Sequence, residues 1–229
     1  MDLKKVYSLL MEEYGPQGWW PLTPDGQTKT EHHSGRPRHD LHRFEIILGA
    51  ILTQNTAWTN VEKALEQLYK SKLVDHNRIL RTKHEKLAPL IRSAGYYNQK
   101  AERLRIIAEF VRENPISSLM KKGTEELRQM FLSVKGIGPE TADSIVLYAF
   151  GKPTFVIDAY TKRIFSRMGV CSKDVDYHEL QKLFMQQFRP DVKKYQEYHA
   201  LIVEHAKQHC RAKPVCEGCP TYSVCKRKM

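Results

Sequence analysis

The stretch from Leu132 to Arg163, LSVKGIGPETADSIVLYAFGKPTFVIDAYTKR, constrains the fold of this chain more than any other. Its apolar residues recur with the period of an α-helix, which predicts a helix over 139–150 with one buried face: Ala142, Ile145, Val146, Ala149 and Phe150. Pro139 suits the first position of this helix, where its missing N–H would have no partner within the helix. Gly136 and Gly138 allow a tight turn before it. Such a turn directs free N–H groups outward, which predicts a site for an anion such as phosphate.

The composition indicates a folded protein with a basic surface. The chain has 229 residues, 41% of them hydrophobic, which is enough to bury a core in one large domain or two small ones. Lysine and arginine total 37 against 26 acids, for a net charge of +11. This balance suits a polyanion, because each neutralised phosphate releases counterions. A basic soluble protein without a nucleic-acid partner would have the same balance, so charge alone leaves both open.

The periodicity elsewhere predicts an all-α chain of many short helices joined by tight loops. No convincing alternating strand and no sequence repeat is found. The expected helices are 4–13, 44–52, a helix around 61–69, and segments near 84–93, 98–113, 123–134, 158–168, 176–187 and 191–209. No apolar run reaches the roughly 18 residues of a membrane span. The N-terminus does not resemble a secretory signal, so we expect a cytoplasmic protein.

A polar loop at 22–40 separates the first two helices and is rich in histidine. The histidines in and beside it are His32, His33, His39 and His42. They lack a helical spacing as a group, so solvated histidines are favoured over a metal site.

Four cysteines near the C-terminus predict a metal centre. They have the spacing C-x5-C-x2-C-x5-C: Cys210, Cys216, Cys219 and Cys225. This spacing suits a [4Fe–4S] cluster with four thiolate ligands. Structural zinc usually takes two C-x2-C pairs and is the second alternative, with free thiols the third. Cys171 stands apart and is most simply a core or surface thiol.

The string LxxVKGIGPETA resembles the helix-hairpin-helix of the endonuclease III superfamily of DNA glycosylases. The resemblance implies a base-excision repair enzyme on double-stranded DNA containing a damaged base, which it flips out of the stack. In that family the hairpin holds DNA, and the matching residues are Lys135, Gly136, Ile137, Gly138 and Thr141. An aspartate follows about one helix later, and Asp158 is in that place. Its carboxylate is expected to favour an oxocarbenium-like transition state and to orient water. Taken alone, Asp158 would be only a helix cap.

The residue before Thr141 divides the family. Members similar to endonuclease III have a lysine there, which attacks the sugar and leads to strand cleavage. This chain has Glu140, which we expect at the catalytic site with Asp158. A carboxylate cannot form a Schiff base, so the resemblance implies a monofunctional enzyme that leaves an abasic site. The adenine-mismatch members carry a glutamate at the position that matches Gly49, which argues against their chemistry.

The segment Trp19-Trp20-Pro21 followed by FEIILGAILTQNTAW looks like the 3-methyladenine glycosylase branch. That resemblance implies a base pocket for alkylated purines, formed by Trp19, Trp20, Pro21, Gln54, Trp58 and Tyr160. From composition alone, the Trp pair could equally fill a gap between domains. The alternatives are a family member for another lesion (uracil, a T·G mismatch or an oxidised pyrimidine) and a non-catalytic iron–sulfur DNA-binding protein.

The terminal cysteines resemble the cluster loop that closes endonuclease III and the adenine-mismatch glycosylases. The familiar pattern has six residues in the first gap, whereas this chain has five. The family architecture implies two helical domains with a DNA cleft between them, and a monomer. We expect a six-helix domain at 36–152, with the hairpin at 132–150. The other domain would combine 1–35 with 153–229 and the cluster loop at 210–225.

Overall fold

The computed structural model describes residues 2–32 and 36–227, so His33 of the polar loop lies outside the described residues. Within those ranges the chain is helical, apart from one isolated antiparallel bridge between Leu22 and Glu31. The expected all-α class is therefore confirmed. The chain divides into two compact units, Trp20–Lys152 and Met1–Trp19 with Pro153–Met229.

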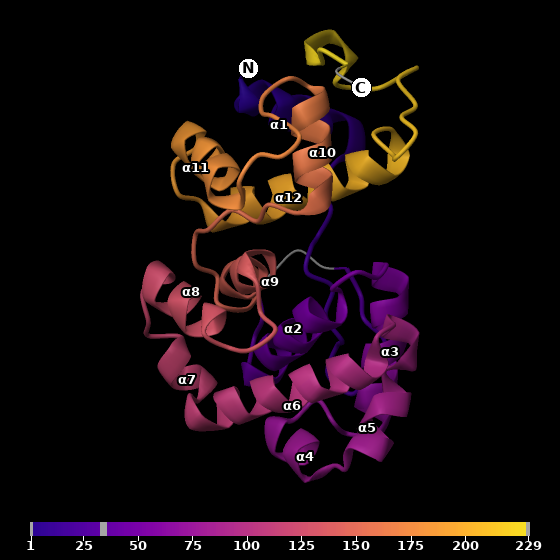
Figure 1. Cartoon of the computed structure of the whole chain (residues 1–229), viewed down its shortest axis with the longest axis vertical. Helices are drawn as coiled ribbons and strands as arrows, with labels where there is room; N and C mark the ends of the chain where they lie inside the picture. The colour runs from indigo at the N-terminus through magenta and orange to yellow at the C-terminus, as the bar shows by residue number, and fades with distance from the viewer. Residues whose placement is uncertain (1, 33–35, 228–229) are drawn as a thin grey trace. The chain divides into compact units, whose positions relative to one another are not determined.

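The unit Trp20–Lys152 is built around the buried helix α2 (Figure 1). Apolar side chains cover α2 nearly all round, so helices must surround it; α3, α6, α9 and η2 pack on it. The helices of this unit are α2 Asp40–Leu52, α3 Trp58–Lys70, α4 His76–Arg81, α5 His84–Leu90, η1 Arg92–Ala94, α6 Tyr97–Glu113, α7 Ile116–Leu119, α8 Thr124–Leu132, α9 Pro139–Ser144 and the π-helical η2 Ile145–Ala149.

This unit begins earlier in the chain than the residue 36 expected from the sequence. The reason is a buried carboxylate on α2. Glu45 accepts hydrogen bonds from Thr23 N at 3.0 Å, from Thr23 Oγ1 at 2.8 Å and from Tyr69 Oη at 2.7 Å. Burial raises the pKa of Glu45, although these donors favour its charged form. The contacts fix the segment that contains Trp20 and Leu22 on the helical core.

The other unit contains α1 Leu3–Tyr14, α10 Ala159–Arg167, α11 Tyr177–Gln187, α12 Val192–Gln208 and the short η3 Tyr222–Val224. Its core is rich in aromatic rings: Phe155 stacks on Phe184 at 4.3 Å, and Tyr198 and Tyr195 meet Phe155 edge-on. Helix α1 packs on α12 with Leu3, Val6 and Leu10 fully buried.

None of the described helices is both long and apolar enough to cross a membrane.

Candidate functional site

The glycine turn before α9 has the conformation that its sequence requires. Gly136 has a φ of +89°, and a Cβ there would lie 2.9 Å from Arg103 Nε. A side chain at this position would therefore meet both backbone strain and a steric clash. Ile137 is buried beneath the turn, and its N–H donates to Val134 O at 3.1 Å. Gly138 is the N-cap residue of α9, with Pro139 in its first turn, so the first N–H groups of the helix have no partner within it.

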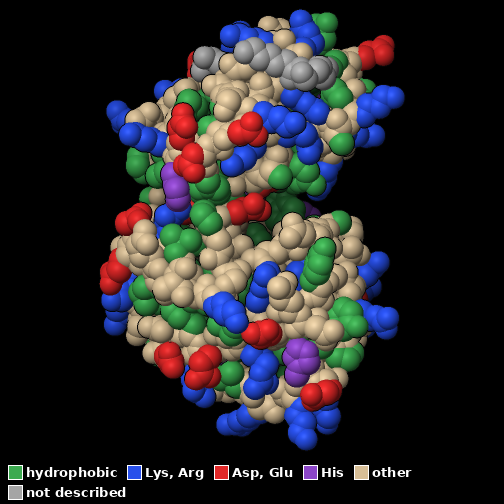
Figure 2. Space-filling model, viewed as in Figure 1, with side chains coloured by type: hydrophobic (Ala, Val, Ile, Leu, Met, Phe, Trp, Pro, Cys, Tyr) green, Lys and Arg blue, Asp and Glu red, His purple; other side chains and the backbone are tan. Residues whose placement is uncertain are grey.

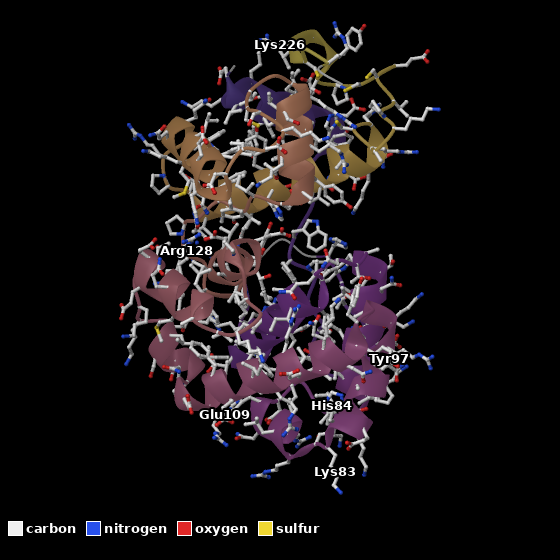
Figure 3. All side chains as sticks on the ribbon, viewed as in Figure 1. Lys83, His84, Tyr97, Glu109, Arg128 and Lys226 are labelled. Carbon is white, nitrogen blue, oxygen red and sulfur yellow. The ribbon has the colours of Figure 1, made fainter. Side chains whose placement is uncertain are left out.

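A buried ion pair braces the hairpin from behind. Arg128 of α8, labelled in Figure 3, donates from Nε to Asp143 Oδ1 at 2.8 Å and from Nη2 to Oδ2 at 3.2 Å. Both side chains are buried, and this bidentate geometry fixes α8 against α9.

Gln54, predicted to line a base pocket, contacts the hairpin. Its Nε2 donates to Gly136 O at 3.1 Å and to Thr141 Oγ1 at 3.0 Å, and its Oε1 accepts a hydrogen bond from Arg103. Lys135 is 81% exposed, and Glu140 lies exposed in the first turn of α9. The structure therefore brings the predicted DNA-contacting residues together on one braced turn, with Gln54 as part of the bracing.

Three aromatic rings meet on the core of the same unit. Trp20 packs edge-on against Trp58, with ring centroids 5.2 Å apart, and lies 5.2 Å from Tyr148. A Cβ at Gly49 would be only 3.2 Å from Trp20 Cζ2, so this glycine lets the indole approach α2 closely. Trp20 is 7% exposed, which gives it a packing role, whereas Trp58 is half-buried. Pro21 is buried beside them.

Asp158 is the N-cap of α10, in the other unit. Its Oδ1 accepts hydrogen bonds from Thr161 N and Thr161 Oγ1, both at 2.7 Å. Its Oδ2 lies 3.7 Å from His199 Nε2 on α12. The carboxylate is 12% exposed. Burial by itself would raise its pKa, but the contacts with His199 and Thr161 outweigh burial and lower the pKa of Asp158.

Asp158 differs from the other helix caps of this unit. All four of its α-helices begin at an aspartate that accepts a backbone hydrogen bond: Asp2, Asp158, Asp176 and Asp191. The other three are exposed, and Asp158 is the one that is mostly buried and faces a histidine. A cap alone requires neither feature.

His199 is a site residue that sequence reasoning missed. It lies on α12, where the apolar periodicity accounts for the buried residues on either side of it, and it belongs to no recognisable sequence motif. Tyr160 is partly exposed one residue into α10, and the Arg163 guanidinium lies 4.9 Å from its ring centroid. Trp19 is half-buried, and the chain before it is fixed by a hydrogen bond from Gln17 N to Glu197.

The four terminal cysteines line one small cavity: Cys210, Cys216, Cys219 and Cys225. Burial raises the pKa of Cys225, and the nearby Cys210, Cys219 and Cys216 add to this effect. N–H groups point at the sulfurs, from Arg167 Nη1 to Cys210 at 3.4 Å and from Arg227 N to Cys225 at 3.3 Å.

The residues around these thiols also fit a metal cluster. Arg167 donates to the carbonyl oxygens of Arg211 and Ala212, which fixes the loop. Burial lowers the pKa of His205 to about 4, so this neighbour of Cys219 stays neutral. Four converging thiols with N–H donors to sulfur suit a thiolate-ligated cluster.

A braced Gly-rich hairpin together with a buried capping aspartate defines a class of DNA repair enzyme. The family of HhH-GPD superfamily base excision DNA repair proteins matches residues 48–190. The chain belongs to this family, which confirms the resemblance seen in the sequence. It is a base-excision repair DNA glycosylase whose partner is DNA.

Individual proteins similar to this chain are consistent with this family assignment. The protein MJ1434 of Methanocaldococcus jannaschii, which carries the name of a DNA repair glycosylase, is 43% identical over 98% of this chain and 96% of its own length. The 3-methyladenine DNA glycosylase of H. pylori bound to 1,N6-ethenoadenine is 27% identical, with a TM-score of 0.71, over 91% of this chain and 98% of that one. An endonuclease III–DNA complex shares the fold at 20% identity, with a TM-score of 0.77 and coverage of 99% and 96%.

Proposed function

We propose that this glycosylase hydrolyses the N-glycosidic bond of alkylated purines in double-stranded DNA, as a monomer, with Asp158 as the catalytic carboxylate. The burial of Asp158 and its contact with His199 carry this proposal, because a capping residue needs neither. As the bond breaks, its electron pair leaves with the base and positive charge develops on the sugar. The Asp158 carboxylate stabilises that charge, and water adds to C1′ and loses a proton.

The alkylpurine class is supported by the H. pylori 3-methyladenine glycosylase among the relatives and by the aromatic residues Trp19, Trp20, Trp58 and Tyr160. A 3- or 7-alkylated purine is positively charged and leaves as a neutral base, so it needs little acid catalysis. A cationic base also gains from an aromatic face. The half-buried rings of Trp58 and Trp19 and the partly exposed Tyr160 are better placed to offer one than the buried Trp20.

A monofunctional mechanism is supported by Glu140 at the position of the family's lysine nucleophile. The buried Lys100 does not replace that lysine, since its Nζ donates to Leu52 O at 2.8 Å and to Ala94 O at 2.7 Å. Lys135, Gly136, Ile137, Gly138 and Thr141 form the proposed phosphate-binding hairpin, with backbone N–H groups at the start of α9 and a lysine beside them.

The four cysteines are the proposed ligands of a [4Fe–4S] cluster, which would fix the C-terminal loop as a rigid unit. Iron and sulfide analysis of anaerobically purified protein tests this assignment. We expect about four of each per chain, and their loss in Cys219→Ser. One zinc per chain in place of iron would overturn it.

Single-turnover release of bases from methylated DNA by the wild type and by Asp158→Asn tests the catalytic proposal. Asparagine caps helices as well as aspartate does, so the variant keeps α10. We expect the wild type to free 3-methyladenine and the variant to be slower by about 100-fold or more. Equal urea denaturation midpoints for the two proteins would show that folding is not the cause.

Three results would contradict parts of this proposal. Undiminished base release by Asp158→Asn would remove its catalytic role. Release from uracil-containing or mismatched duplex, with none from methylated DNA, would keep the glycosylase and reject the alkylpurine class. Trapping of the wild type on abasic DNA by borohydride would reject the monofunctional mechanism.

A further inference from the structure

Three potential metal ligands meet at the start of α2, in a place that the proposed glycosylase reaction does not use. They are Asp25, His39 and His42, and one ligand atom from each lies within 4.8 Å of those of the other two. Sequence reasoning favoured solvated histidines here because the four histidines lack a common spacing. The structure starts α2 at Asp40, so His39 is its N-cap residue and His42 lies one turn on. A spacing of three residues places both imidazoles on one side of the helix.

The distances in this cluster suit a single small cation. Asp25 Oδ1 lies 2.9 Å from His39 Nε2 and 3.8 Å from His42 Nε2. Neighbouring ligands in a tetrahedral zinc site are about 3.3–3.4 Å apart, which follows from metal–ligand bonds of about 2.0–2.1 Å. These two separations fall on either side of that value, so small side-chain rotations suffice to reach it. The imidazole rings lie alongside each other, with centroids 3.9 Å apart and an interplanar angle of 34°.

His42 and the backbone before Asp25 are held by the core of the unit. His42 is buried, and its Nε2 lies 3.1 Å from the carbonyl oxygen of Thr23. Thr23 is in turn anchored by its N–H and hydroxyl groups on the buried Glu45. A backbone segment anchored on a buried carboxylate keeps Asp25, two residues on, near the two histidines. The Thr23–Glu45 hydrogen bonds involve no ligand atom, so they keep this segment in place when His42 Nε2 turns from Thr23 O to an ion.

The charges at the cluster are mixed. The His39 hydrogen bond is the main cause of the lowered pKa of Asp25, and His42 and Arg38 add to it. Arg38 opposes a bound cation, whereas Asp25 and the carboxylate of Glu45 favour one. Asp25 is 73% exposed and His39 is 41% exposed, so an ion can enter from solvent and keep water as a further ligand.

We propose that Asp25, His39 and His42 form a binding site for a divalent transition metal of the zinc class. Two imidazoles and one carboxylate are the donor set that such metals prefer, with one position open to water. An ion needs the Nε2 lone pairs, so each imidazole binds as its neutral tautomer with the proton on Nδ1. The Nε2 hydrogen bonds from His39 to Asp25 and from His42 to Thr23 O are then given up. The site is independent of the proposed glycosylase reaction, and it ties residues 23–25 to the start of α2.

Calorimetric titration of the full chain with Zn²⁺ tests the site, with Asp25→Asn and His39→Gln as the variants. Both residues are exposed, so neither change disturbs the core. His84→Gln, on α5 of the same unit and labelled in Figure 3, is the matched control. We expect one equivalent of Zn²⁺ to bind the wild type and His84→Gln, and to bind the two site variants more than tenfold more weakly. Zn²⁺ should raise the melting temperature of the wild type and of His84→Gln, and not that of the two site variants, because binding to the folded state stabilises it.

Titration with Co²⁺ distinguishes this site from the cysteine loop. Cobalt bound by nitrogen and oxygen shows weak visible bands, whereas thiolate ligation adds strong sulfur-to-metal charge-transfer absorption. We expect the equivalent that is lost in His39→Gln to be the one without charge-transfer absorption. The proposal is overturned if the wild type binds no such equivalent, or if the wild type and both site variants bind it alike.

Discussion

At the level of single residues, the ionisation of Asp158 depends on two opposed environments. Burial favours the neutral acid, whereas the contacts with His199 and Thr161 favour the carboxylate, and the net result is a lowered pKa. The proposed reaction requires the carboxylate. His199, 3.7 Å away on α12, is therefore a positioning residue that keeps Asp158 ionised.

Replacement of His199 by glutamine should move the acid limb of the pH profile of base release. With the histidine contact removed, burial acts with less opposition, so the pKa of Asp158 rises and activity is lost at a higher pH than in the wild type. The rate above that limb should fall less than in Asp158→Asn. Single-turnover rates across the acid range measure both effects.

His178→Gln, on α11 of the same unit, is the control and should keep the wild-type profile. An acid limb that stays in place in His199→Gln, with only a lower rate throughout, would show that His199 supports the fold and not the ionisation of Asp158.

Sequence analysis could find Asp158 but not its partner. Asp158 follows a recognisable hairpin at a characteristic distance, whereas His199 is brought to it by the packing of α10 on α12. The same limit applies to Trp20 and Trp58. Adjacent tryptophans predict an ordered aromatic segment, but only the fold shows that Trp20 is buried over Gly49 while Trp58 remains half-buried.

At the level of helices, a buried lysine joins three elements. Lys100 of α6 donates to the carbonyl oxygens of Leu52 at the end of α2 and of Ala94 at the end of η1. Carbonyls at the last turn of a helix lack partners within it, so Lys100 satisfies groups that would otherwise be costly to bury. Burial lowers the pKa of Lys100 to about 8.

The unfolding free energy should therefore rise with pH through the alkaline range because of Lys100. Between about pH 8 and about 10.5 the unfolded chain holds this proton and the folded protein does not, so stability rises with pH, by up to about 3 kcal/mol. Lys100→Met should lack this rise and should lose about 1–3 kcal/mol near neutral pH, since two buried carbonyls lose their donor.

Urea denaturation of both proteins across this range measures the effect. The difference between the two curves isolates Lys100, because tyrosines with a raised pKa, such as Tyr69, titrate in both proteins. Parallel curves would contradict the assigned role.

Helical periodicity located most of the elements, and its failures have physical causes. The short helices α4 and α7 span only six and four residues, too few for a period to show. The predicted helix over 139–150 changes to π-helical winding at Ile145, and the segment expected near 84–93 breaks into α5 and η1. Such changes of winding depend on tertiary packing, which the hydrophobic periodicity of the sequence does not reveal.

At the level of the whole molecule, the positive net charge favours binding to DNA. The net charge is +11, and Figure 2 shows lysine and arginine side chains spread over the visible face of each unit, with acids among them. Charge of this kind gives sequence-independent affinity that falls with salt. Lys135 beside the hairpin is highly exposed. Its ion pair with Glu102, at 3.4 Å, is solvated and therefore weak, so Lys135 can leave Glu102 and contact a phosphate.

Replacement of Lys135 alone should change the salt dependence of DNA binding. A lysine that neutralises one phosphate contributes about 0.9 to the slope of log K against log salt concentration, so Lys135→Ala should reduce the slope by about one. Fluorescence anisotropy with a short duplex at several salt concentrations measures the slope.

Lys83→Ala, at an exposed lysine before α5, is the matched control and should leave the slope unchanged. Equal slopes for Lys135→Ala and the wild type would exclude a phosphate contact by Lys135.

The discontinuous unit formed by Met1–Trp19 and Pro153–Met229 constrains how the chain can be made. Helix α1 leaves the ribosome before α12, yet α1 buries Leu3, Val6 and Leu10 in a unit that includes α12. Tyr198 of α12 donates to Leu3 O at 2.9 Å. Residues 20–152 can fold during translation. Over this period the apolar face of α1 remains exposed to solvent. Completion of this unit therefore requires α12 to be synthesised, and a ribosome stalled before Val192 would display α1 without its partner, open to chaperones.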